Sequence, residues 1–124
     1  MRFSELLKEE ITTLNNIYRG DLPDDREMIW NFVNRDDFNT PLEIGVMPRY
    51  KLLITLLSQY RVEHVDDITD MLDTEQKEIV EMYENDPNLS TSVIVVVDGK
   101  IVDGNHRALA AALTNQSIRY VELT

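Results

Sequence analysis

Apolar positions in the first half of the chain recur mostly at a helical spacing. This spacing predicts a helix from Ser4 to Gly20, a second helix that begins at a capping box of Asp24 and Glu27, and a third whose first turn holds Pro48. The apolar faces are Leu7, Ile11, Leu14 and Tyr18 in the first helix, Met28, Ile29, Trp30, Phe32 and Val33 in the second, and Leu52, Leu53, Leu56, Leu57 and Tyr60 in the third. We therefore expect residues 1–60 to be mainly helical.

Three further segments have patterns of their own. Residues 42–46 alternate apolar side chains with polar or small ones, which is the period of a strand. Residues 61–72 carry apolar positions at a helical spacing, and we favour a helix there because their acidic residues would then form one solvated edge. Asp73 and Gln76 form a second capping box, which predicts a helix that ends near Pro87.

The last third of the chain is rich in strand signals. Residues 93–97 are an unbroken β-branched run, as expected for a strand that is buried on both faces. Asp98 and Gly99 then form a two-residue hairpin signal. A strand at 100–103, a helix at 105–114 and a strand at 118–123 follow, and we expect them to form a right-handed strand–helix–strand unit. The predicted fold class is α+β, a small mixed sheet with a C-terminal hairpin and the N-terminal helices packed on it.

Length and composition indicate one ordinary globular domain. The 124 residues suffice for a single modest core, so we expect residues 1–124 to form one domain with its main core in 61–124. The absence of cysteine excludes disulfides and a cysteine nucleophile, and the two histidines lack the spacing of a zinc site. The first ten residues are too charged for a signal peptide, and no apolar run could span a bilayer. These features predict a cytoplasmic protein that does not insert into a membrane.

The charge of the chain restricts its partners. Twelve basic residues stand against twenty-three acidic ones, which gives a net charge of −11. A protein that binds DNA non-specifically needs basic patches to neutralise phosphates, and this sequence has none. We therefore do not expect direct binding to duplex DNA, whereas a protein partner with a basic surface would fit.

The densest cluster of chemically useful residues is Asp103-Gly104-Asn105-His106-Arg107, between a predicted strand and a predicted helix. Gly104 permits a sharp turn and a close approach to the backbone, and the first amides of a helix attract anions. His106 and Arg107 would add side-chain donors to that anion site. The alternatives are structural: a salt bridge between Arg107 and Asp103, a histidine that stabilises the turn, and a helix cap at Asp103 or Asn105.

The segment DGNHRALAA resembles the phosphate-binding motif of the ParB/sulfiredoxin-like superfamily, and the match extends over residues 93–123. This resemblance implies a nucleotide-phosphate pocket at residues 104–107 and would tolerate a strand within 61–72. The family often supplies a second basic residue from an early strand, for which Arg49 is the candidate; an ordinary surface arginine is the alternative. The implied ligand is a nucleoside triphosphate, ATP or CTP, with Mg²⁺ that Asp103 would hold.

The sequence also departs from well-known members of the superfamily. No helix-turn-helix module follows the last strand, so we do not expect chromosome partitioning on DNA, and Asn105 stands where sulfiredoxin has its catalytic cysteine. Small, acidic versions of this motif resemble accessory proteins of phages and mobile elements. Two functions stay open: a nucleotide- or phosphate-ester-binding protein, with hydrolysis or nuclease action undecided, or a non-enzymatic acidic protein that imitates DNA and docks a basic partner.

Overall fold

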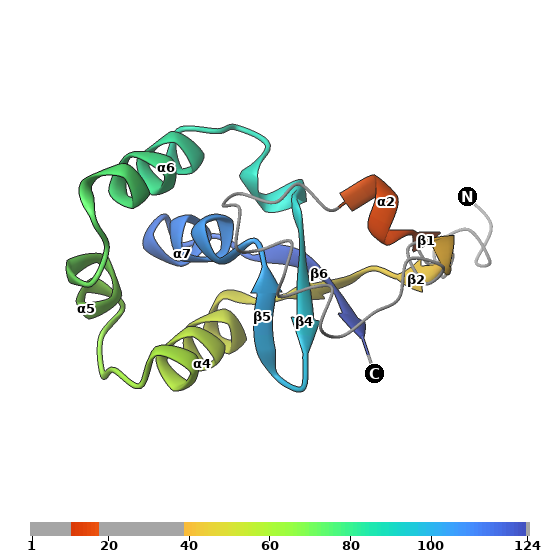
Figure 1. The fold of residues 1–124 in the computed structure, drawn as a ribbon, viewed down its shortest axis with the longest axis horizontal. Helices are drawn as coiled ribbons and strands as arrows, with labels where there is room; N and C mark the ends of the chain where they lie inside the picture. The colour runs from red at the N-terminus through yellow and green to blue at the C-terminus, as the bar shows by residue number, and fades with distance from the viewer. Residues whose placement is uncertain (1–10, 18–38, 124) are drawn as a thin grey trace.

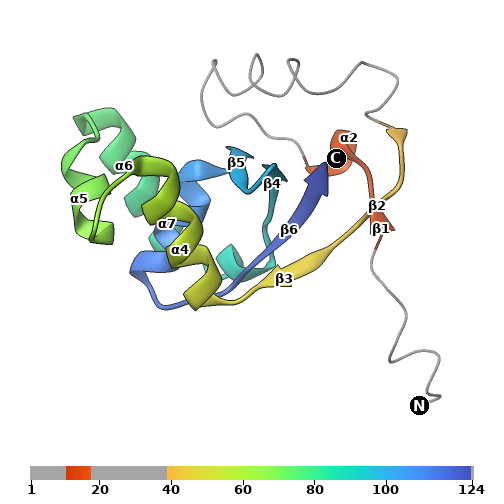
Figure 2. The same cartoon turned by 90° about the horizontal axis from the view of Figure 1, so that it is seen from below.

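The structure is a computed structural model that describes residues 11–17 and 39–123. A four-stranded sheet has helices packed on one face and a short N-terminal segment on the other (Figures 1 and 2). Its strands are β3 (Gly45–Met47), β4 (Val93–Val97), β5 (Lys100–Asp103) and β6 (Ile118–Leu123). The helices on the first face are α4 (Arg49–Tyr60), α5 (Val65–Asp70), α6 (Thr74–Glu84) and α7 (Asn105–Leu113). The α+β class predicted from the sequence is confirmed.

The sheet is mixed, with the strand order β3-β6-β4-β5. β4 and β5 form the expected antiparallel hairpin, and its two turn residues, Asp98 and Gly99, have φ of 50° and 78°. Positive φ at both positions matches the twist of a tight two-residue hairpin turn. β6 is parallel to β4 and antiparallel to β3. The predicted mixed sheet and hairpin are therefore both present.

The strand–helix–strand unit differs from the expected arrangement. β5, α7 and β6 follow one another along the chain, but β6 pairs with β4 and not with β5. Because β5 is antiparallel to β4 and β6 is parallel to it, the two strands of the unit run in opposite directions. The parallel crossover joins β4 to β6, and the hairpin strand β5 is part of the connection.

The burial of β4 explains its unbroken apolar sequence. Ile94 and Val96 contact the cluster formed with α4, α5, α6 and α7. Val93, Val95 and Val97 belong to a second cluster on the other face, which also contains Leu14, Val102, Val121 and Leu123. All five residues of the strand are buried, as predicted for a strand covered on both faces.

The helices between residues 48 and 85 follow their predicted patterns. α4 follows Pro48 and buries Leu52 and Leu56 of its apolar stripe. Residues 65–70 form the helix favoured within 61–72, with Ile68 buried. α6 begins at the capping box of Asp73 and Gln76 and ends before Asn85. A 3₁₀ turn, η2 (Leu89–Thr91), leads into β4.

The N-terminal segment corrects one prediction. Residues Ile11–Thr12 are not helical but form the strand β1, which pairs antiparallel with β2 (Leu42–Glu43). Only Leu14–Ile17, α2, is helical in this segment. The strand pairing with β2 supplies hydrogen bonds that the helical pattern could not reveal. The other residues of the predicted first helix, and all of the helix predicted from Asp24, lie outside the described residues.

The predicted strand at residues 42–46 is divided into β2 and β3, which pair with β1 and β6 respectively. Ile44 lies between the two strands and contacts the second apolar cluster. Within residues 11–17 and 39–123, no helix is long and apolar enough to cross a membrane.

Candidate functional site

The turn between β5 and α7 depends on Gly104. This residue occupies the N-cap position of α7 with a φ of 89°, a conformation that side chains of L residues rarely adopt. A Cβ at this position would lie 2.7 Å from Cγ2 of Ile94 and 2.8 Å from Nη2 of Arg107. The sharp turn expected at Gly104 is therefore present, and the close approach to its backbone is made by the protein's own side chains.

Arg107 and Asp103 form a buried ion pair. Nη2 of Arg107 lies 3.3 Å from Oδ2 of Asp103, and the two side chains are 1% and 0% exposed. Nη1 of Arg107 also donates a hydrogen bond of 3.0 Å to the carbonyl oxygen of Val93. These contacts are the salt bridge that the sequence left open as an alternative. They tie the first turn of α7 to β4 and β5.

The surroundings of Asp103 do not fit a magnesium ion. Mg²⁺ usually keeps several water ligands, whereas this carboxylate has no exposed surface and pairs with a guanidinium. The described residues also contain no group of three or more histidine, cysteine or acidic side chains that could hold a metal. Asp103 is better suited to orienting Arg107 than to binding a cation.

Asn105 is held by its neighbours from α4 and β5. Its Nδ2 donates to the carbonyl oxygen of Ile101 at 3.1 Å, and its Oδ1 accepts from Gln59 at 3.2 Å and from the hydroxyl of Tyr60 at 3.4 Å. Gln59 additionally accepts from the amide of Ile101 and donates to its carbonyl, at 2.8 and 3.1 Å. The amide of Gln59 thus pairs with the outer edge of β5 and fixes the start of α7.

Asn105 and His106 are the motif residues that line a hollow. The α7 hollow, with a volume of about 260 Å³, lies between the first turn of α7 and the α5–α6 connection. It is lined by Tyr60, Met71, Leu72, Gln76, Asn105, His106 and Leu109. The His106 side chain is 6% exposed, and its Nδ1 has no hydrogen-bond partner among the described residues. A buried polar atom without a partner costs about 1–3 kcal/mol, which a ligand could recover.

Arg49 lies at the other end of α7. Its Nε donates to the carbonyl oxygen of Ala112 at 3.3 Å, in the last turn of the helix. A cation is favourable there because it stands at the negative end of the helix dipole. The structure therefore does not bring Arg49 to the residues of the motif. The other histidine, His64, precedes α5 and is exposed, away from the α7 hollow.

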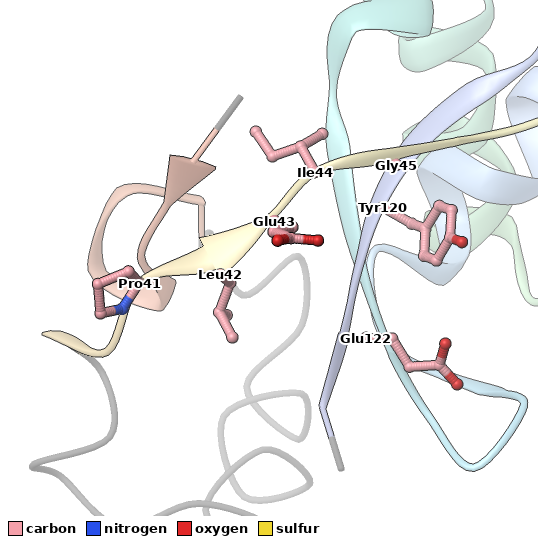
Figure 3. Close-up of a pocket in the computed structure, with 7 residues that line it drawn as sticks. All are labelled: Pro41, Leu42, Glu43, Ile44, Gly45, Tyr120 and Glu122. Carbon is pink, nitrogen blue, oxygen red and sulfur yellow. The ribbon is translucent and has the colours of Figure 1, made fainter. Parts of the chain in front are cut away.

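A second hollow, of about 590 Å³, lies between β2 and β6 (Figure 3). It is lined by Pro41, Leu42, Glu43, Ile44, Gly45, Tyr120 and Glu122. Glu43 points across the gap toward β6, from which Tyr120 and Glu122 project. Both carboxylates are exposed, so they contribute to the acidic surface without indicating a particular ligand.

The sequence pattern singled out the five motif residues but not the rest of the α7 hollow. The sequence pattern places Gln76 in a capping box and Tyr60 on an apolar helix face. Their closeness to His106 results from the packing of α4 and α6 beside α7, which no local motif encodes. Comparison with known proteins gave no matching family model, curated protein or solved structure.

Proposed function

We propose that this chain binds a small phosphate-bearing ligand of the nucleotide class at the start of α7. The observation that carries this proposal is His106, a buried imidazole with an unpaired Nδ1 in the wall of a hollow. Catalytic and binding sites are places where an otherwise costly unpaired polar group is retained. His106 is therefore the side chain proposed to contact the ligand.

The start of α7 supplies the attraction for the phosphate. The helix has nine residues, and the first amides of any helix lack acceptors inside it and stand at the positive end of its dipole. The resemblance of DGNHR to the ParB/sulfiredoxin-like phosphate motif supports the same placement. In this proposal Gly104, Asp103 and Arg107 shape the turn, and Asn105 and His106 border the ligand.

The proposal concerns binding and assigns no reaction. ATP and CTP are the first ligands to test, without a required metal ion, because Asp103 is already paired with Arg107. Pyrophosphate and ribose 5-phosphate test the phosphate group alone. The net charge of −11 opposes any anionic ligand at long range, so measurements belong at moderate salt, where that repulsion is screened.

The decisive experiment compares the two histidines of the chain. Isothermal titration calorimetry with ATP, CTP, pyrophosphate and ribose 5-phosphate should show saturable binding, and His106→Leu should weaken it about ten-fold or more, since it removes a charge-assisted hydrogen bond. Leucine fills most of the space of the imidazole, which protects the fold. His64→Leu is the matched control and should leave affinity unchanged, because His64 is exposed and outside the hollow. Equal losses in both variants, or no binding of any phosphate probe, would contradict the proposal.

The surface of α5 and α6 favours a second candidate, the docking of a basic protein. Residues 61–86 contain ten acidic residues and two basic ones, Arg61 and Lys77. Met71 and Met82 are 61% and 59% exposed on the same helical pair, and such flexible apolar side chains often contact protein partners. In this candidate the acidic surface attracts the partner and the methionines add apolar contact.

This candidate is tested with two double variants that change the net charge equally. Glu75→Gln with Glu78→Gln alters α6, whereas Glu43→Gln with Glu122→Gln alters the far side of the molecule. Binding to a lysine-rich amphipathic peptide, followed by fluorescence anisotropy, should weaken only in the α6 variant. Equal weakening in both would indicate attraction by overall charge and would remove the case for a defined surface.

A further inference from the structure

The walls of the α7 hollow contrast with the phosphate motif beside them. Of the seven described residues that line it, none is a carboxylate, a lysine or an arginine. Leu72 and Leu109 contribute apolar surface, while the polar lining groups are two amides, a phenol and an imidazole. In the proposed function the phosphate lies at the first amides of α7. Because the described lining of the hollow carries no carboxylate, lysine or arginine, it suits an uncharged part of the same ligand.

The size of the hollow limits what that part is. Sites for whole drug-sized ligands usually measure roughly 300–1,000 Å³, and this one measures about 260 Å³. It therefore accommodates one compact group and not an entire nucleoside triphosphate. Met71 and Leu72 of the α5–α6 connection line one part of the space, and Asn105 and His106 of the first turn of α7 line another.

The hydrogen-bonding groups of the lining favour a ring that carries acceptors at its edge. The side chain of Asn105 already forms hydrogen bonds with Ile101, Gln59 and Tyr60. Gln76 uses Oε1 to accept from the amide of Asp73, which leaves the donors of its side-chain amide to face other groups. The imidazole of His106, with its unpaired Nδ1, stands in the same wall. Gln76 and His106 therefore both contribute hydrogen-bonding side chains to the lining of the hollow.

The exposed thioether of Met71 favours an aromatic group in the hollow. Met71 lines the hollow, yet its side chain is 61% exposed. Contact between a thioether and an aromatic ring is favourable, and a bound ring would also cover apolar surface that now faces water. An aliphatic group would cover the same apolar surface, but it would lack the contact between sulfur and an aromatic ring.

We infer that the α7 hollow binds an uncharged heteroaromatic ring, such as a nucleobase, between the α5–α6 connection and the first turn of α7. This inference rests on the proposed function, because the phosphate of the same ligand lies at the α7 amides. It makes Met71, Leu72 and Gln76 the residues that select the ring, whereas His106 lies where ring and phosphate meet.

The test separates the ring from the phosphate. Calorimetry on the full chain uses adenosine and cytidine as rings without phosphate, ribose 5-phosphate as phosphate without a ring, and AMP and CMP as both. At least one monophosphate should bind ten-fold or more tightly than ribose 5-phosphate. Met71→Ala should weaken that monophosphate about three- to ten-fold and leave ribose 5-phosphate unchanged. Met82→Ala, an equally exposed methionine outside the hollow, should change neither.

The outcomes distinguish this inference from the proposed function. If ribose 5-phosphate binds as tightly as AMP and CMP, the ring site is wrong and the phosphate site stands. If the nucleosides bind but ribose 5-phosphate does not, the phosphate site is wrong and the hollow still holds a ring. A loss of ribose 5-phosphate binding in Met71→Ala would also overturn the inference, because Met71 would then act on the site as a whole. Binding of no probe overturns both.

Discussion

Nη2 of Arg107 lies 3.3 Å from Oδ2 of Asp103, and both side chains are buried. The two residues are four positions apart, one at the end of β5 and the other in the first turn of α7. Their attraction fixes the direction in which the helix leaves the sheet, and the second hydrogen bond of Arg107, to Val93, extends that constraint to β4. The DGNHR segment therefore fixes α7 relative to β5 and β4, and it is also the proposed binding site.

Removing one partner of this ion pair and leaving the other should strongly destabilise the fold. Arg107→Met leaves the buried carboxylate of Asp103 without its cation, and we expect a loss of about 3–5 kcal/mol in the free energy of unfolding. Urea denaturation followed by circular dichroism measures it. Asp98→Asn, which removes an exposed charge in the hairpin turn, is the control and should cost less than about 0.5 kcal/mol.

The double variant Asp103→Leu with Arg107→Met separates an isolated buried charge from simple loss of packing. Replacing both partners with apolar residues removes the uncompensated charge, so the double variant should be more stable than Arg107→Met alone. A double variant that is less stable by the sum of both single losses would show that the pair does not act as a unit.

Two glycines with positive φ should respond differently to alanine. Gly104→Ala places a Cβ within 3 Å of Ile94 and Arg107, whereas a Cβ at Gly99 meets nothing within 4 Å. Both changes carry the strain of a left-handed backbone, about 1–2 kcal/mol, but only Gly104→Ala adds the cost of overpacking, about 1–3 kcal/mol. Thermal unfolding of the two variants should therefore give the lower midpoint for Gly104→Ala. Equal midpoints would mean that the neighbours of Gly104 move aside freely.

We expect the side chain of Gln59 to contribute to the stability of the fold, because it bonds to the backbone of β5. Gln59→Leu removes the hydrogen bonds to both backbone groups of Ile101 and one of the bonds to Asn105. The carbonyl oxygen of Ile101 still accepts from Asn105, so the main loss is the acceptor of the Ile101 amide. An unsatisfied buried backbone group costs about 1–3 kcal/mol, and we expect a loss of that size in urea denaturation. Ser58→Ala changes the preceding, exposed residue and should be nearly neutral. A similar small effect in both variants would show that water replaces Gln59 at the edge of β5.

Local signals in the sequence were sufficient for most elements but not for their partners. The β-branched run of β4, the Asp98-Gly99 turn and the capping box at Asp73 each depend on neighbouring residues, so they could be read from the sequence. The strand at Ile11–Thr12 could not, because its hydrogen bonds go to residues 42–43. The pairing of β6 with β4 also depends on residues that are distant along the chain, so no local pattern within either strand predicts it.

The same distinction applies to the candidate site. The glycine turn and the Asp103–Arg107 pair lie within five consecutive residues, and the sequence suggests both, the pair as the alternative to anion binding. The contacts of Gln59 with Ile101 and Asn105 span 42 and 46 residues along the chain. Since no periodicity links such distant positions, the network around Asn105 and the lining of the α7 hollow required the folded arrangement.

Duplex DNA should bind this chain weakly at physiological salt. The net charge of −11 repels the phosphate backbone, and the buried guanidinium of Arg107 is not presented to a DNA surface. Fluorescence anisotropy with a labelled random duplex, measured from about 0.05 to 0.2 M salt, should give no saturable submicromolar binding. The α6 variant with Glu75→Gln and Glu78→Gln should improve binding only slightly, because removing two charges leaves the chain strongly acidic. Tight binding that weakens steeply with salt would instead require a basic surface formed when several copies of the chain assemble.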